Sequence, residues 1–256
     1  MPMPAMRPVP GEVFYPESDG LPMSDNTRQF RWIQVLSGNL AALFRDRPDV
    51  FVCGNQNWFP VEGEPNIKAA PDAYVVFGRP KGDRPSYKQW EEDGVPMTVV
   101  FEVLSPSNTH AEMAEKLAFY EDYGAEEYYL YDPDSNLLLG YLRQGSVLRR
   151  QRPMDGFVSP RLGITFDLTG PELVVRYPDG RPFLPFEELD AERRHAEELA
   201  EQERQRAEQE RQRAEQAERR AARLAELTRK TLGHETTPDE VAELERLLQP
   251  SPPPVS

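Results

Sequence analysis

Three side chains in the middle of the chain have types suited to phosphate-ester hydrolysis: Asp72, Glu102 and Lys116. Asp72 ends "IKAAPD" and opens the apolar stretch "AYVVF", whereas Glu102 lies inside "VVFEVLSPSN". Acids on two adjacent strands can place two carboxylates at one hard divalent cation, which prefers oxygen ligands and keeps several waters. A nearby lysine can then orient or deprotonate the attacking water, or neutralise charge that develops on phosphate.

Glu102 carries the strongest of these signals. Both faces of the strand predicted for residues 99–104 are apolar apart from this carboxylate: Val99, Phe101 and Val103 lie on one face, Val100 and Leu104 on the other. That pattern is typical of an interior strand. Because a buried carboxylate without a partner costs several kcal/mol, we expect Glu102 to be paired, protonated or bound to a metal.

Each of the other candidates also has a structural interpretation. Asp72 follows a proline, an order that suits a turn. Lys116 stands four residues after Glu112, which is the favourable order for an ion pair on a helix. Tyr120, one helical turn beyond Lys116, also suits packing in the core. Only Glu102 is poorly explained by burial alone.

Two helices and several strands are predicted around these residues. Residues 26–44 form an amphipathic helix, with apolar side chains at Ile33, Leu36, Leu40 and Leu43. Short β-like stretches follow in "DVFVCGN", "QNWFPVE", "PDAYVVFG" and "MTVVFEVL". The segment "HAEMAEKLAFYEDYG" is a second helix, because Thr109 and Glu112 have capping-box spacing and Gly124 is a natural end.

More strands are predicted after the second helix. "EEYYLYDPDSNLLLGYLRQG" reads as a strand, an Asp-Pro turn and a strand, and "LRRQRP" and "RLGITFDL" add further sheet. The tyrosines of "EEYYLY" are expected to form sheet core rather than a platform on which bases stack. The order of elements predicts the α/β class, with a mixed sheet flanked by helices.

The composition changes after Phe186. The heptad "ERQRAEQ" occurs twice in succession from residue 203, and the stretch 189–231 lacks glycine and proline. A long charged helix is therefore predicted. Its apolar seam is mostly alanine, so a weak coiled coil and a solvated single helix both remain open. A short helix with a Thr237 cap and Pro238 at its start follows, and "QPSPPPVS" is expected to be disordered.

Composition narrows the classes of function. The 256 residues carry 30 basic and 44 acidic side chains, a net charge of −14, which argues against a surface that generally coats nucleic acid or membranes. One cysteine, Cys53, excludes an intrachain disulfide and suits a reducing cytoplasm. Three scattered histidines argue against a histidine-rich zinc site. No signal peptide or membrane span is expected.

Four segments in a fixed order resemble the Uma2 family of endonucleases, within the PD-(D/E)XK superfamily. They are "YPESDGLPMSDNT", "APDAYVVFGRPKGDRPSYKQWEEDG", "VVFEVLSPSNT" and "KLAFYEDYGAEEYYLYDP". The resemblance spans roughly residues 14–168 and excludes the repeat. With it the chain divides into an irregular segment 1–25, a nuclease-like domain 26–186, a heptad helix 187–232 and an end segment 233–256.

The resemblance implies a restriction-endonuclease-like core that cleaves phosphodiester bonds with Mg²⁺ or Mn²⁺. Asp72 matches the acid of the Pro-Asp element and Glu102 the second acid, with the Val103 carbonyl as a further metal ligand. The lysine that the pattern expects two residues after Glu102 is a leucine here, and Lys116 on the next helix fits a known displaced position. Tyr120 is an accessory candidate on the same helix face.

Many members of the superfamily also carry an acid on the first helix. The helix predicted for residues 26–44 has none, and Glu17 before it is the remaining accessory candidate.

Two functions follow from these patterns. The first is a metal-dependent DNA endonuclease that acts by attack of water. The alternative is a non-catalytic binding or assembly module that keeps the nuclease scaffold and works through its C-terminal helix. A homodimer, or association through residues 189–231, is compatible with either function.

Overall fold

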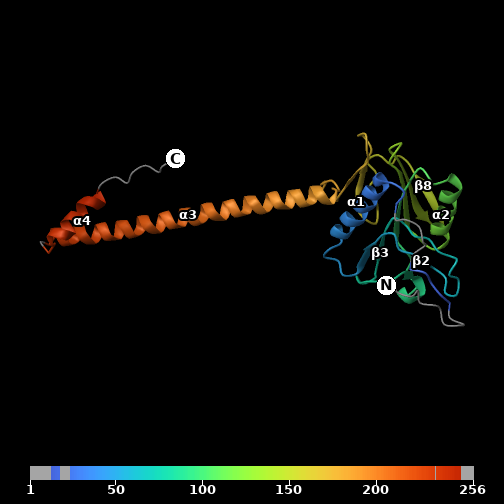
Figure 1. The fold of residues 1–256 in the computed structure, drawn as a ribbon, viewed down its shortest axis with the longest axis horizontal. Coiled ribbons are helices and arrows are strands. Elements are labelled where there is room, and N and C mark those ends of the chain that lie inside the picture. Colours follow the sequence, from blue (N-terminus) through green and yellow to red (C-terminus); the bar gives the residue numbers. More distant parts are fainter. Residues whose placement is uncertain (1–12, 18–23, 234, 249–256) are drawn as a thin grey trace, which may run out of the picture. The chain divides into compact units, whose positions relative to one another are not determined.

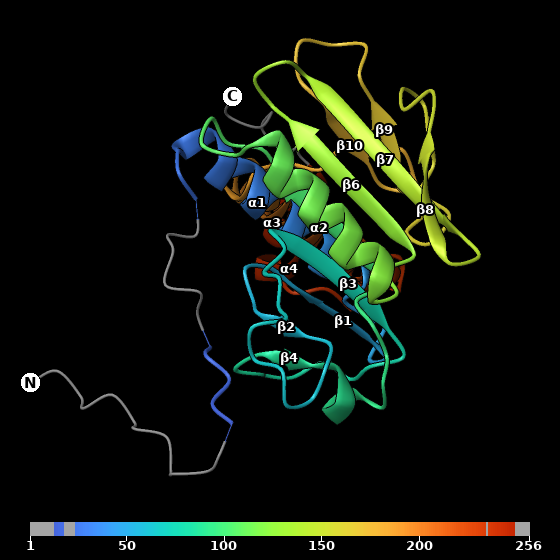
Figure 2. The ribbon, with the colours of Figure 1, turned by 90° about the vertical axis from the view of Figure 1, so that its right-hand side faces the viewer.

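The computed structural model describes residues 13–17, 24–233 and 235–248. Its centre is a six-stranded mixed sheet in the order β1-β3-β5-β6-β7-β8, in which β5 and β6 are parallel and the other neighbours antiparallel (Figure 2). The strands are β1 Val50–Cys53, β3 Ala73–Phe77, β5 Val99–Val103, β6 Glu127–Asp132, β7 Leu137–Gln144 and β8 Val147–Gln151.

One helix packs on each face of this sheet. Helix α1, Thr27–Leu43, contributes Trp32, Leu36 and Leu40 to a core with Val99, Phe101 and Val103. Helix α2, His110–Asp122, covers the opposite face, where its Tyr120 packs in a core with Val100 and Leu130. The predicted alternation of the strand at residues 99–104 is therefore confirmed, and β5 is buried along its whole length.

Local capping explains where both helices begin. The Asn26 side chain accepts a hydrogen bond from the Gln29 amide at the start of α1. At the start of α2, Thr109 and Glu112 form the predicted capping box. Each cap satisfies amide groups that have no partner inside the helix. Gly124, just beyond α2, has a φ of +98°, which glycine adopts without strain.

Small elements complete the first part of the chain. Strands β2 (Trp58–Phe59) and β4 (Tyr87–Lys88) pair in parallel, and a 3₁₀ turn, Gln89–Glu92, follows. Strands β9 (Thr165–Asp167) and β10 (Val174–Arg176) form an antiparallel pair. The predicted mixed α/β class, with a central mixed sheet between helices and a long C-terminal helix, is confirmed.

The C-terminal helices are α3, Phe186–Leu232, and α4, Pro238–Leu248 (Figure 1). The chain divides into two compact units, residues 1–189 and 190–256. Within the second unit, α4 pairs with the end of α3 through two ion pairs, Arg223–Glu243 at 2.7 Å and Lys230–Glu240 at 2.7 Å.

The predicted Thr237 cap is present, and it exchanges hydrogen bonds with Glu240. The expected disordered end, residues 249–256, lies outside the described residues, as does most of the segment 1–25. Among the described helices, none has the length and apolar character needed to cross a membrane.

Candidate functional site

Pairing of β3 with β5 brings the two predicted acids together. Asp72 immediately precedes β3, and because Ala73 pairs with Phe101 in antiparallel register, Asp72 lies beside Glu102. The Asp72 carboxylate accepts a 2.7 Å hydrogen bond at Oδ2 from the Val103 amide. Both acids are buried, with exposed fractions of 8% for Asp72 and 3% for Glu102. The strand register alone therefore places two carboxylates at one point of the sheet.

Helix α2 supplies the partners of Glu102. Lys116 Nζ lies 2.9 Å from Oε2, and the Tyr120 hydroxyl donates a 2.5 Å hydrogen bond to Oε1. The two donors are one helical turn apart, so they reach the same carboxylate from the same helix face. Glu112, the other candidate partner of Lys116, instead accepts from Asn108 and from the Thr109 amide in the capping box.

Tyr120 combines the packing role and the polar role that its position predicts. Its ring is fully buried and stacks on Trp58, with ring centres 6.3 Å apart and an interplanar angle of 12°. Burial raises the pKa of its hydroxyl well above the ordinary value, and the charge of Glu102 adds to this. The hydroxyl therefore remains protonated and acts as a donor to Glu102.

The electrostatics of the pair are asymmetric. Burial raises the pKa of Asp72 to about 8, and repulsion from Glu102 contributes. Burial alone lowers the pKa of Lys116, but attraction to Glu102 outweighs it and leaves the pKa above the ordinary value. One ammonium thus balances one of the two carboxylates near neutral pH. Further positive charge is needed before both acids can ionise together.

Sequence reasoning missed two residues that lie around this site. Gln29 of α1 donates a 3.0 Å hydrogen bond from Nε2 to the Val103 carbonyl, and its Oε1 accepts from the Asp25 amide at 2.8 Å. Asp25 also accepts hydrogen bonds from Ser105 and Ser107 on the loop that follows β5. The contact between Asp25 and Gln29 is local, at the start of α1. The contacts with Val103, Ser105 and Ser107 join segments about 80 residues apart, so no local sequence pattern marks them.

The acid expected near the first helix remains unassigned. The charge of Asp25 reaches the site, since it contributes a small part of the rise in the pKa of Asp72. Among the described residues, no hydrogen bond or ion pair joins Glu17 to Asp72, Glu102 or Lys116. The accessory role of Glu17 stays a prediction, and Asp25 is the more direct candidate.

The donor set fits a hard divalent cation. Asp72, Glu102 and the Val103 carbonyl offer only oxygen atoms, the ligands that Mg²⁺ prefers, and Mg²⁺ usually completes its shell with water. The Val103 carbonyl accepts one hydrogen bond and keeps a second lone pair. No group of three or more His, Cys, Asp or Glu with metal-holding geometry occurs in the part of the chain that is described. Two acids and one carbonyl are therefore the protein ligands on offer.

Comparisons with known proteins identify the family of the chain. The family model Uma2, described as "Putative restriction endonuclease", matches residues 21–169. One solved structure that matches is "a putative nuclease belonging to DUF820 from Anabaena variabilis ATCC 29413", with 12% identity and a TM-score of 0.40, covering 52% of this chain and 72% of that one. No curated protein matches. Because the family model covers more than half of its length, the chain belongs to the Uma2 family.

Proposed function

We propose that this protein is a metal-dependent DNA endonuclease that hydrolyses phosphodiester bonds with Mg²⁺ or Mn²⁺. The observation that carries the proposal is the meeting of two buried carboxylates, Asp72 and Glu102, with the ammonium group of Lys116. Membership of the Uma2 family supports a nuclease-type reaction. The proposed protein ligands of the cation are Asp72, Glu102 and the Val103 carbonyl.

When bound, the divalent cation would activate water and stabilise charge on the phosphate. The residues of the chain prepare that chemistry. Lys116 is held against Glu102 at 2.9 Å, from where its ammonium group can position the nucleophile or offset charge on a phosphate oxygen. Tyr120 fixes the orientation of the Glu102 carboxylate, and Gln29 fixes the Val103 carbonyl. Such supporting contacts keep ligands in a productive geometry.

Cleavage of supercoiled plasmid DNA by the purified protein tests this proposal. Mg²⁺ or Mn²⁺ should support nicking or cutting, EDTA should stop it, and both Asp72→Asn and Lys116→Met should lower the rate by at least about a hundredfold. Asp155→Asn, a change of the same type at an exposed loop position, is the control and should cut normally. Normal cleavage by both Asp72→Asn and Lys116→Met would remove both residues from the mechanism.

The alternative, a non-catalytic module on the nuclease scaffold, is favoured by one observation. Glu102 is already satisfied inside the protein, because Lys116 and Tyr120 occupy both of its oxygens. Calorimetry with Mn²⁺ separates the two functions. The endonuclease requires binding that is lost in Glu102→Gln. An absence of binding, together with unchanged stability of Glu102→Gln, would support the scaffold function instead.

We also propose that the chain associates through the heptad segment 189–231. Two copies would bring two active sites to a DNA duplex, and "ERQRAEQ" repeats with the seven-residue period of a coiled coil. Light scattering of the full chain should then give about twice the 29.3 kDa of one copy, whereas the chain without residues 190–256 should give the mass of a single copy of that shorter chain. A monomeric mass for the full chain would contradict association.

A further inference from the structure

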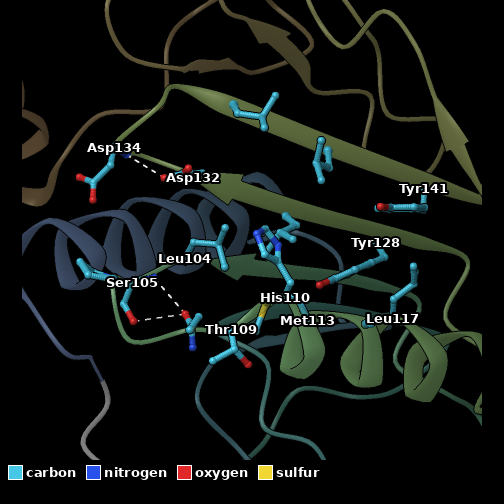
Figure 3. Close-up of a pocket in the computed structure, with 16 residues that line it drawn as sticks. Leu104, Ser105, Thr109, His110, Met113, Leu117, Tyr128, Asp132, Asp134 and Tyr141 are labelled. Atoms are coloured by element: carbon cyan, nitrogen blue, oxygen red, sulfur yellow. Dashed lines mark hydrogen bonds between the residues drawn. The ribbon is translucent and has the colours of Figure 1, made fainter.

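A cavity of about 520 Å³ lies between α2 and strands β6 and β7 (Figure 3). It belongs to the same sheet face as Glu102 but borders a different side of α2. Met113 and Leu117 of α2 and Leu139 of β7 line it, together with Tyr128 and Tyr141. Its volume falls in the range of sites that hold small organic molecules, and its walls are mainly apolar and aromatic, as such sites require.

The aromatic wall suits a flat ring. Tyr128 and Tyr141 stack with their centres 5.7 Å apart and an interplanar angle of 23°. Tyr128 is almost fully buried and Tyr141 is half-buried, so Tyr141 supplies the accessible face at this end of the cavity. Figure 3 shows the Tyr128 ring reaching from β6 into the space beside α2. A planar heteroaromatic ligand gains contact area and stacking energy on such a surface.

The Tyr128 hydroxyl lacks a partner. The side chain is only 1% exposed, and its oxygen makes no hydrogen bond within the described residues. A buried polar group without a partner is costly, so such groups in native proteins usually meet a ligand or water. The hydroxyl can both donate and accept, as can the base edges of nucleotides. The cavity therefore offers one unsatisfied polar contact beside an aromatic face.

The charge at the other end of the cavity limits the type of ligand. Asp132 and Asp134 line that end, and His110 and Asn108 stand near the start of α2. Asp134 also pairs with Arg28 at 2.6 Å, outside the cavity lining. Carboxylates repel phosphate but accept hydrogen bonds from exocyclic amino groups. The cavity thus suits a base rather than the phosphate attached to it.

The position of the cavity connects it to the catalytic acids. Leu104, in its lining, is two residues beyond Glu102 on the same face, a separation of roughly 7 Å along an extended chain. Tyr128 also packs against Tyr120, the donor to Glu102, with ring centres 5.0 Å apart. A ligand in the cavity would therefore lie about one nucleotide's length from a phosphate group bound at Asp72 and Glu102.

We infer that this cavity binds a nucleobase, which stacks on Tyr141 and forms a hydrogen bond with the Tyr128 hydroxyl. The inference rests on the proposed nuclease function, because it deepens the description of the substrate at the same site. The bound nucleobase belongs either to an unpaired nucleotide of the strand that is cut or to a free nucleoside. Unpaired bases of single-stranded nucleic acid are commonly bound by stacking on aromatic side chains.

Binding can be tested in EDTA with the full-length protein, so that neither cleavage nor metal binding affects the result. The probe is a single-stranded oligonucleotide with one 2-aminopurine, compared with the same strand carrying an abasic site there. Adenosine, guanosine, cytidine and thymidine are tested separately by saturation-transfer NMR. Ala114 lines the cavity from an exposed position on α2, so Ala114→Trp fills the entrance. Ala118→Trp, one turn further at another exposed position, is the matched control.

Wild type and Ala118→Trp should change the 2-aminopurine fluorescence, whereas Ala114→Trp should bind at least about tenfold more weakly. Tyr128→Phe should weaken binding about fivefold, the effect of one neutral hydrogen bond. Nucleoside binding with the same dependence on Ala114→Trp, without a signal from the strand, would identify a free nucleoside as the source. Equal behaviour of all four proteins toward strands with and without the base, and no nucleoside binding, would overturn the inference. Circular dichroism melts confirm that each variant is folded.

Discussion

The two ends of the parallel β5–β6 pair each bury a glutamate, yet the two carboxylates have different surroundings. Glu102, near the carboxyl end of β5, meets Lys116 and Tyr120 and lies beside Asp72. Glu127, at the amino end of β6, is equally buried at 2% exposure. Its partners are the hydroxyls of Tyr129 and Ser159 and the Arg161 amide.

The difference teaches that burial of an acid does not by itself mark a site. The three donors around Glu127 are neutral, and they fix a loop against the sheet. Glu102 instead has a cation and a second acid, an arrangement whose charge balance changes when a ligand binds. It also lies at the carboxyl end of a parallel strand, where α/β proteins commonly place their ligands. We therefore propose a chemical role for Glu102 and a structural role for Glu127.

The largest effect that we expect separates the two glutamates by activity. Glu102→Gln keeps the size of the side chain but removes its charge, and should lower the DNA cleavage rate about a thousandfold. Glu127→Gln, the matched control, should cut within about twofold of wild type once the fraction of folded protein is corrected for. Initial rates of plasmid nicking with saturating Mn²⁺ measure both. A large loss of activity at Glu127 would break the distinction.

Stability should separate Glu127 from its neighbour Glu126. Glu127→Ala leaves three buried donors without an acceptor and should reduce the free energy of unfolding by roughly 3 kcal/mol. Glu126→Ala, at the neighbouring position, removes only an exposed ion pair with Arg161 and should cost less than about 1 kcal/mol. Urea unfolding followed by circular dichroism gives both values. Similar losses in the two variants would show that the Glu127 network contributes little.

A smaller effect tests the two tyrosine donors. Tyr120→Phe keeps the ring in the core but removes the donor to Glu102, and should lower the cleavage rate about tenfold, or about 1.4 kcal/mol in activation free energy. Tyr129→Phe removes the matching donor to Glu127 and should leave the rate unchanged. Equal rates for Tyr120→Phe and wild type would mean that the orientation of Glu102 does not depend on this hydroxyl.

The smallest expected effect is a pH dependence of stability at Glu127. Burial raises the pKa of this carboxyl, although hydrogen bonds from Ser159 and Tyr129 act in the opposite direction. A raised pKa in the folded state means that folding binds a proton. The stabilisation of the fold by protonated Glu127 is therefore complete below the pKa of the unfolded state, near 4.5. It is lost as pH rises through the pKa of the folded state.

The glutamine of Glu127→Gln does not titrate. The free energy of unfolding of wild type should therefore fall relative to that of the variant as pH rises above 4.5. Urea midpoints between pH 4 and 8 measure the shift. A difference that is constant over this range would contradict a raised pKa.

Much of the fold could be predicted because its signals are local. The capping box of Thr109 and Glu112 acts within four residues, and the alternation around Glu102 needs only the geometry of one strand. The burial of Glu102 and its need for a partner could be predicted for the same reason, since an acid among apolar neighbours is visible without a structure. The burial of Glu127 is not predicted, because the tyrosines beside it indicate only sheet core and two of its three partners lie more than 30 residues away.

The sequence by itself determined the order of elements, both faces of β5 and the identity of the acids and the lysine, because side-chain periodicity and helix caps depend on near neighbours. Only the tertiary structure decided that Lys116 turns to Glu102 rather than Glu112, that Gln29 and Asp25 reach the same site, and that α2 leaves a cavity beside Tyr128. These contacts join distant segments, and their geometry depends on how helices pack across the sheet.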